Sequence, residues 1–235
     1  MRILAIETSG SAGSVAALDG GLPLAQLDLD PQLRSARTLA PGLQQVLREV
    51  GWAPAEVQLL AIGLGPGSFT GLRLGVMTAK AFAYATGAAI LGIGTLDAIA
   101  WRAPAEAGTI AVGIDAQRGE VYCGSFTREP AGATAAAGAR DVVAAGPVDI
   151  VAAARWIDSL PAGCVVTGPA LAKLAESLPA GLPPAPRESW QPTAAAVGQL
   201  AALRAARGAR DDVWKLAPLY LRRSAAEEKW QSPAK

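Results

Sequence analysis

The chain has 235 residues and a formal net charge of +1, and 51% of its residues are hydrophobic. A chain of this length and composition forms a globular fold with a substantial core. Acidic and basic residues are mixed along it, whereas a protein that grips phosphate backbones by itself usually carries a basic face. Histidine is absent, which excludes Ser-His-Asp triads, histidine acid–base chemistry and histidine-containing metal sites.

The two cysteines do not supply a metal site either, because two thiolates alone cannot complete a zinc coordination shell. Cys123 and Cys164 lie in apolar runs and are interpreted as small buried hydrophobic residues. The sequence reaches a charge at Glu7, too early for a secretory signal, and the uncharged runs 57–72 and 81–96 are too short and broken for a membrane span. We therefore expect a soluble, cytoplasmic protein without a metal or a membrane segment.

The first part of the chain predicts a sheet followed by alternating helices and strands. Short apolar runs separated by glycine-containing turns predict three antiparallel strands. Apolar residues at three- and four-residue spacing then predict an amphipathic helix. The expected strands are 2–6, 14–18, 23–29, 59–64 and 90–93, and the expected helices are 35–50, 71–86 and 96–101.

The pattern of an apolar strand, an acid, a turn and a returning strand occurs twice. Glu7 follows the first copy, and Asp115 follows the second copy at 109–114, with a returning strand at 120–127. The repeat predicts two similar lobes in an α/β protein, with domains at 1–105 and 106–235. In the second lobe we expect a loop at 129–145, a strand at 164–167 and helices at 148–160, 169–178 and 193–207.

The glycine-rich loop from Gly65 to Gly71, Gly-Pro-Gly-Ser-Phe-Thr-Gly, leads from an expected strand into an expected helix. Bare amides at a helix N-terminus bind anions, so the loop is one candidate for a phosphate cradle. It is not a Walker A sequence, because no lysine follows its last glycine. The alternative is structural: the glycines make the turn, and Ser68 or Thr70 caps the helix.

The helix after this loop carries a stripe of small residues at every fourth position. A glycine inside a helix costs about 1 kcal/mol relative to alanine, so Gly75 indicates that another element approaches closely. The approaching element is either part of this chain or a second subunit, and large apolar residues flank the stripe. The candidate partner-interface residues are Gly71, Leu72, Gly75, Val76, Ala79 and Ala83.

The two acids at strand ends define a second candidate site. Facing carboxylates at such positions can hold a Mg²⁺-nucleotide through water, although they can equally satisfy the amides of a turn. The candidate residues are Glu7, Thr8, Ser9, Asp115 and Gly168. A basic group at Arg204, Arg207 and Arg210 is interpreted as the solvated side and end of the final helix.

Several motifs together resemble the TsaB family. They are Leu4-Ala5-Ile6-Glu7-Thr8-Ser9, the loop continued to Leu72-Arg73, Gly94-Thr95-Leu96-Asp97, Asp115-Ala116-Gln117-Arg118-Gly119-Glu120-Val121-Tyr122 and Pro218-Leu219-Tyr220-Leu221-Arg222. They follow the family's order and run nearly from end to end of the chain. The loop is the most specific of them.

The resemblance implies two ribonuclease-H-like lobes of the actin/Hsp70/sugar-kinase superfamily. It implies a non-catalytic scaffold subunit without a catalytic residue or cofactor of its own, required for transfer of threonylcarbamoyl to N6 of adenosine 37 in tRNA. The implied partners are the catalytic paralogue TsaD and the ATPase TsaE, with a homodimer when the chain is alone and tRNA reached only through the complex. Family members pair through helices of the first lobe, which favours the intermolecular interpretation of the stripe.

Departures from the nucleotide-binding relatives weaken the alternative function, an ATP-binding kinase or ATPase that uses Glu7 and Asp115. Those relatives carry an Asp-containing turn followed by glycine, and a Gly-Gly turn near adenosine. Here Glu7-Thr8 replaces the first, and Pro169 follows Gly168 where a second glycine is expected. A nucleotide in the cleft is therefore not expected, while one at a complex interface stays open. A protease function lacks the histidine or zinc spacing that it needs.

Overall fold

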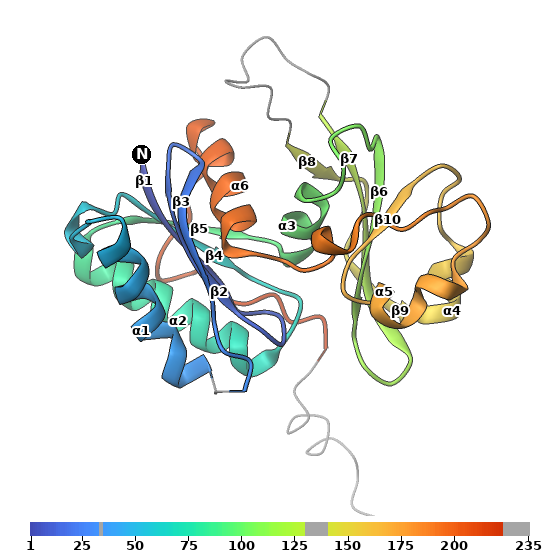
Figure 1. The fold of residues 1–235 in the computed structure, drawn as a ribbon, viewed down its shortest axis with the longest axis horizontal. Coiled ribbons are helices and arrows are strands. Elements are labelled where there is room, and N and C mark those ends of the chain that lie inside the picture. Colours follow the sequence, from blue (N-terminus) through green and yellow to red (C-terminus); the bar gives the residue numbers. More distant parts are fainter. Residues whose placement is uncertain (33–34, 130–140, 223–235) are drawn as a thin grey trace, which may run out of the picture.

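The computed structural model describes residues 1–32, 35–129 and 141–222, which form two lobes, each built on one mixed sheet (Figure 1). Within those ranges, no helix combines the length and the apolar character that crossing a membrane requires. The interpretation of 2–29 as three antiparallel strands is confirmed, and the first sheet has the order β3-β2-β1-β4-β5. Its strands are β1 (Arg2–Glu7), β2 (Ser14–Asp19), β3 (Leu22–Asp28), β4 (Leu59–Gly63) and β5 (Ala89–Ile93).

Both faces of the first sheet are covered by helices, with α1 (Ser35–Glu49) and α2 (Phe69–Thr86) on one face and α6 (Ala194–Ala206) on the other (Figure 1). Successive strand side chains point to opposite faces. Leu4 and Ile6 therefore join the core beneath α1 and α2, whereas Ile3 and Ala5 join the core beneath α6. Burial on both faces explains why β1 reads as a continuous apolar run.

The second sheet repeats the central strand pairing of the first. β6 pairs with β7 antiparallel and with β10 parallel, as β1 pairs with β2 and β4. The predicted repeat is thus confirmed, and so is the fold class of two ribonuclease-H-like lobes. The elements of this lobe are β6 (Thr109–Asp115), β7 (Glu120–Arg128), β8 (Val142–Ala144), β9 (Asp149–Ala152), α4 (Ala153–Asp158), β10 (Val165–Thr167) and α5 (Leu171–Leu174).

Two secondary-structure predictions in the second lobe are wrong. Residues 142–144, expected in a loop, form β8, and residues 149–152, expected in a helix, form β9; both strands pair with β7. Each is a short run rich in β-branched residues, which suits a strand once a neighbouring strand is available. Most of the loop expected at 129–145 lies outside the described residues.

A shared core joins the lobes. Helix α3 (Thr95–Trp101) lies between them, and one apolar cluster includes Ile3 of β1, Leu96 of α3, Phe126 of β7 and Val197 of α6. Helix α6 falls in the expected second domain by sequence, yet it packs mainly on strands of the first sheet. The boundary at residue 105 stays a prediction, but the last helix belongs by its contacts to the first lobe.

Candidate interlobe cleft and outer face of the second helix

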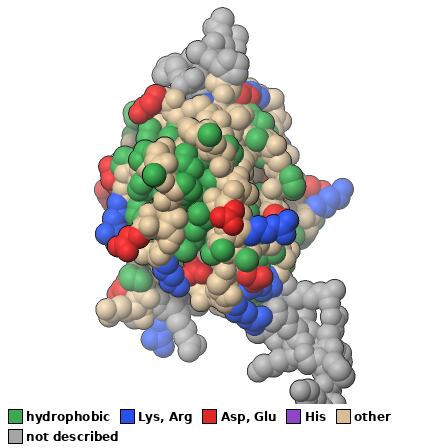
Figure 2. All heavy atoms as spheres, turned by 90° about the vertical axis from the view of Figure 1, so that its right-hand side faces the viewer, with side chains coloured by type: hydrophobic (Ala, Val, Ile, Leu, Met, Phe, Trp, Pro, Cys, Tyr) green, Lys and Arg blue, Asp and Glu red, His purple; other side chains and the backbone are tan. Residues whose placement is uncertain are grey.

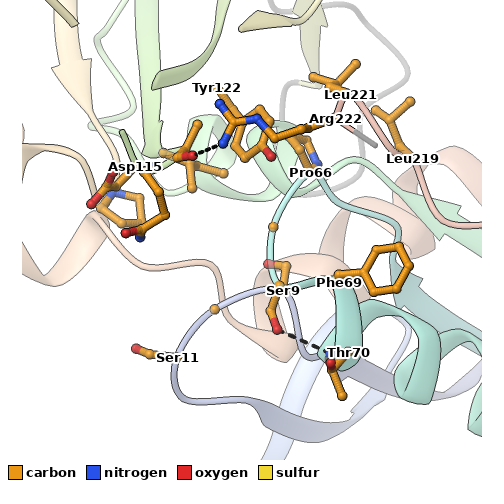
Figure 3. Close-up of a pocket in the computed structure, with 18 of the residues that line it drawn as sticks. Ser9, Ser11, Pro66, Phe69, Thr70, Asp115, Tyr122, Leu219, Leu221 and Arg222 are labelled. Carbon is orange, nitrogen blue, oxygen red and sulfur yellow. Dashed lines mark hydrogen bonds between the residues drawn. The ribbon is translucent and has the colours of Figure 1, made fainter. Parts of the chain in front are cut away.

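A cleft of about 1340 Å³ opens between the lobes. Three walls supply most of its lining: the glycine-rich loop with the β1–β2 turn in the first lobe, the β6–β7 turn with α5 in the second lobe, and the chain that follows α6. Figure 3 shows Ser9, Phe69 and Thr70 on one side and Asp115 and Tyr122 on the other. The third wall consists of Leu219, Tyr220, Leu221 and Arg222.

The glycine-rich loop is built to dock α2 onto the end of β1. The Ser68 amide donates to the Ser9 carbonyl at 2.7 Å, and the Thr8 hydroxyl donates to the Gly71 carbonyl at 2.8 Å. A Cβ at Gly71 would lie 2.1 Å from the Thr8 carbonyl oxygen, so only glycine permits this approach. The Ser68 hydroxyl accepts from the Gly71 amide and caps the helix, as the structural interpretation of the loop predicts.

Glu7 lies beneath the cleft floor, not in it. Its side chain is fully buried, and burial raises the pKa of its carboxyl, an effect opposed by hydrogen bonding to the Ser9 amide at 2.5 Å. Among the described residues, Oε2 of Glu7 has no hydrogen-bond partner. A carboxyl that is buried and easily kept neutral is poorly suited to hold a hydrated Mg²⁺ ion, which prefers ionised oxygen ligands and keeps several waters.

Asp115, the equivalent acid of the second lobe, behaves in the opposite way. It lines the cleft, and Lys173 of α5 donates to its Oδ2 at 2.6 Å. That hydrogen bond lowers the pKa of Asp115, and a second one from the Gln117 amide acts in the same direction. Asp115 is therefore ionised, but its charge is already paired. The kinase or ATPase alternative needs two available carboxylates, and this geometry does not support it.

The other candidate nucleotide-site residues also fall into two groups, those that line the cleft and those buried outside it. Ser9 lines the cleft, whereas Thr8 and Gly168 are buried outside its lining. A Cβ at Gly168 would lie 2.2 Å from the Gly113 carbonyl oxygen, so this glycine is explained by close packing on β6. No group of three histidine, cysteine, aspartate or glutamate side chains placed to hold a metal occurs in the part of the chain that the structure describes.

The small-residue stripe of α2 faces inward, which corrects its assignment as a partner interface. Ala79 is 0% exposed, and a Cβ at Gly75 would lie 2.3 Å from Oγ1 of Thr8 and 3.1 Å from Cδ1 of Ile62. The element that approaches closely is therefore this chain's own first sheet. All six proposed interface residues, Gly71, Leu72, Gly75, Val76, Ala79 and Ala83, are buried in this way.

The exposed side of α2 carries larger residues that the sequence interpretation missed. Met77 is 65% exposed and Tyr84 is 72% exposed, and the ring of Tyr84 meets that of Trp214 edge to face at 5.5 Å. Trp214 is itself 71% exposed. We call Met77, Tyr84 and Trp214 the outer face. Exposed aromatic and methionine side chains grouped in this way are typical of binding surfaces.

The chain after α6 returns along the first lobe and binds α2. We call residues 209–222 the C-terminal strap. Nζ of Lys80 donates to the carbonyls of Trp214 and Leu216, each at 3.1 Å, and the Tyr220 ring packs on Phe69 with centroids 4.9 Å apart. The Tyr220 hydroxyl accepts from Nε of Arg73 at 3.1 Å. The family motif at 218–222 thus lies against the family loop.

The basic group on α6 is only partly the solvated side that the sequence suggested. Arg204 donates from Nη2 to Asp97 at 2.9 Å and to Asp141 at 3.1 Å. It therefore links α6 to α3, which holds Asp97, and to the residue before β8 in the second lobe, which is Asp141. The side chain of Arg204 is 24% exposed, against 47% for Arg207, which pairs with Glu129. Arg204 therefore forms ion pairs with Asp97 and Asp141 between the lobes, which corrects its interpretation as a solvated residue.

Charge on the outer side of the second lobe is mixed. Figure 2 shows this side, where single basic and acidic side chains of the described residues surround a band of hydrophobic ones. Affinity for nucleic acid backbones depends on clustered lysine and arginine, whereas the described charges on this side are of both signs.

Comparison with known proteins agrees with this architecture. The family model of TsaD, tRNA N6-adenosine threonylcarbamoyltransferase, matches residues 32–145. The tRNA threonylcarbamoyladenosine biosynthesis protein TsaB of Escherichia coli is 38% identical over 135 residues, which are 56% of this chain and 58% of that protein. The matched region thus spans little more than half the length of this curated relative.

Longer matches cover nearly the whole chain. An uncharacterised protein of Mycobacterium tuberculosis is 32% identical over 228 residues, 96% of this chain and 93% of that protein. A Pseudomonas aeruginosa crystal structure, described as similar to peptidase YeaZ, superposes with a TM-score of 0.77 at 29% identity, covering 94% of this chain and 99% of that one. A further structure of YeaZ from Pseudomonas aeruginosa gives a TM-score of 0.75 at 27% identity. The chain belongs to the TsaB/YeaZ family.

Proposed function

We propose that this chain is a non-catalytic scaffold subunit of tRNA threonylcarbamoyladenosine synthesis. It pairs with TsaD through the outer face of α2, orients that enzyme, and is required for transfer of threonylcarbamoyl to N6 of adenosine 37. The names of the curated TsaB relatives support the pathway. The match to the TsaD family model supports descent from a common ancestor, and related chains commonly pair through equivalent surfaces.

The observation that carries the scaffold role is the contrast between an accessible outer face and poorly placed catalytic candidates. Met77, Tyr84 and Trp214 are all more than half exposed, whereas Glu7 is sealed beneath the loop and Asp115 is bound by Lys173. Aromatic anchors contribute a large share of binding energy where partners exclude water from them. In this proposal the chain works in the cytoplasm, contacts tRNA only through the complex and holds no cofactor of its own.

The proposal includes two further assemblies, a homodimer and a complex that contains TsaE. A homodimer forms in isolation when the faces of two copies meet, and TsaD displaces one copy. TsaE joins the resulting pair. These assemblies are distinguishable because a homodimer depends on the concentration of this chain alone, whereas pairing with TsaD depends on both components.

A reconstituted modification assay tests the proposal. TsaD, TsaE, the enzyme that supplies threonylcarbamoyl-adenylate and unmodified tRNA are combined with or without this chain. We expect modification to require the chain, and we expect Asp115→Asn and Glu7→Gln to retain at least about half of the activity. Full modification without the chain would contradict the scaffold role. A loss with Asp115→Asn as severe as omission of the chain would restore the enzymatic alternative.

A further inference from the structure

The turn between β6 and β7 is strained. Gln117 has φ 65° and Arg118 has φ 57°, and Gly119 follows with φ 76°. Two successive residues with side chains in the left-handed region are unusual, and such a conformation persists only where its surroundings hold it. The turn follows Asp115 and borders the cleft from the second lobe, as Figure 3 shows. Hydrogen bonds within the turn, from the Gln117 amide to Asp115 and from the Glu120 amide to the Gln117 carbonyl, hold part of this shape.

Arg222 of the strap holds this turn at both of its ends. Its guanidinium donates from Nη1 to the Ala116 carbonyl at 2.5 Å and from Nη2 to the carboxylate of Glu120. The planar guanidinium suits such two-point binding. The Ala116 amide in turn donates to the Glu120 carbonyl at 2.9 Å, which closes the turn. Arg222 thus reaches across the cleft from the first lobe to the strained element of the second.

The same strap is fixed to α2 at the outer face. Lys80 binds the carbonyls on either side of Lys215, next to Trp214, whose ring packs on Tyr84. Further along, the Leu219 amide donates to the Leu64 carbonyl at 2.8 Å. A continuous chain of contacts therefore runs from the outer face to Arg222. Leu216 is buried in the core beneath α2, so the strap is held along its length and does not hang free.

We propose that the C-terminal strap couples the outer face of α2 to the strained β6–β7 turn, with Arg222 as the positioning residue. A contact that fixes Trp214 and the strap strengthens the grip of Arg222 on Ala116 and Glu120, and this holds the second-lobe wall of the cleft. Coupling between two sites is reciprocal, so loss of the grip weakens binding at the outer face by the same factor. Binding of a partner, TsaD, at the outer face rests on the proposed function, whereas the coupling within the free chain does not.

Hydrogen exchange of the turn amides tests the coupling in the free chain. The Ala116 and Glu120 amides report on it, because each is hydrogen-bonded within the turn, to the carbonyls of Glu120 and Gln117. We expect Arg222→Ala to speed their exchange at least about tenfold, and Arg222→Lys, which keeps the charge but loses the planar fork, to give an intermediate rate. Arg155→Ala, an exposed arginine of the same lobe, is the matched control and is expected to change nothing.

Lys80→Met then tests whether a change at the outer face reaches the turn through the strap, because Lys80 contacts the strap but not the turn. We expect it to speed exchange of the same two amides severalfold, and to add nothing further in an Arg222→Ala background, because both changes cut one chain of contacts. Amides of β1 serve as the internal reference for global stability. Wild-type exchange of the turn in Arg222→Ala, or in Lys80→Met, would overturn the proposal.

Addition of TsaD separates this inference from the proposed function. If TsaD binds, exchange at Ala116 and Glu120 is expected to slow in the wild type and to stay unchanged in Arg222→Ala. Bound TsaD with no slowing in the wild type would refute coupling. Failure of TsaD to bind at all would refute the proposed function. The Lys80 and Arg222 variants of the free chain would still decide whether the strap couples the outer face to the β6–β7 turn.

Discussion

Helices α2 and α6 cover opposite faces of the first sheet and are both rich in alanine and glycine, yet their surroundings differ. On α6, the described residues include one exposed position, Ala206, because α3 and the second lobe cover its other side. On α2, the inner stripe is buried, but Met77 and Tyr84 remain exposed. In our proposal, α2 rather than α6 presents the partner surface, because its inner face is buried on the sheet while its outer face keeps large apolar residues exposed.

The largest effect on stability is expected at the inner stripe of α2. Ala79→Trp forces an indole into a position that is 0% exposed, and we expect a loss of roughly 3 kcal/mol or more in the free energy of unfolding. Ala81→Trp places the same side chain on the exposed side of the same helix and is expected to cost less than about 0.5 kcal/mol. Urea unfolding of the pair checks this. Equal stabilities would mean that the stripe does not face the sheet.

The next effect concerns the ion pairs of α6. Arg204→Met leaves the carboxylates of Asp97 and Asp141 without their shared partner, and we expect a loss of about 2 kcal/mol. Arg207→Met removes a more exposed arginine, which pairs with Glu129 at 2.7 Å and lies 3.6 Å from Asp141, and is expected to cost less than about 1 kcal/mol. Thermal unfolding of both variants measures the difference. A larger loss for Arg207→Met would contradict the assignment of Arg204 as the stronger link between α6 and the second lobe.

Much of the fold could be predicted from the sequence, because apolar periodicity and glycine-containing turns determine short strands and amphipathic helices directly. The repeat of β1 and β6 was visible through Glu7 and Asp115. Strands β8 and β9 were missed since their stability depends on pairing with β7, a contact between distant residues.

The candidate site was less predictable. The stripe from Gly71 to Ala83 indicates close approach but not the identity of the approaching element, and the structure shows that it is β1 and β4. The large residues on the other side of the same helix were a usable signal, since Met77 and Tyr84 lie two turns apart. Trp214 could not be placed, because nothing local in the sequence shows that residues after α6 return to α2.

A pH-dependent effect is expected under the N-terminus of α2. Burial raises the pKa of Glu7 above its ordinary value of 4.5 in the folded chain. The folded state then binds this proton more tightly than the unfolded state, so the stabilising contribution is complete below pH 4.5 and is lost as pH rises through the raised pKa. We expect Glu7→Gln to flatten this fall in stability above pH 4.5. Unfolding curves that fall in parallel for both proteins would contradict the assignment.

The smallest effect on stability and the largest on association are expected at the outer face. Met77→Glu with Tyr84→Ser should change the free energy of unfolding by less than about 0.5 kcal/mol. The matched control is Leu22→Glu with Leu24→Ser, because these are also exposed apolar residues of the first lobe, on edge strand β3.

Calorimetric titration of purified TsaD with these two double variants tests the central claim most directly. We predict that the outer-face variant binds at least about thirtyfold more weakly than the wild type, because it lacks two anchor side chains. The β3 variant is expected to bind as the wild type does. Wild-type affinity in the outer-face variant, or equal weakening in both variants, would contradict the proposal that α2 presents the partner surface.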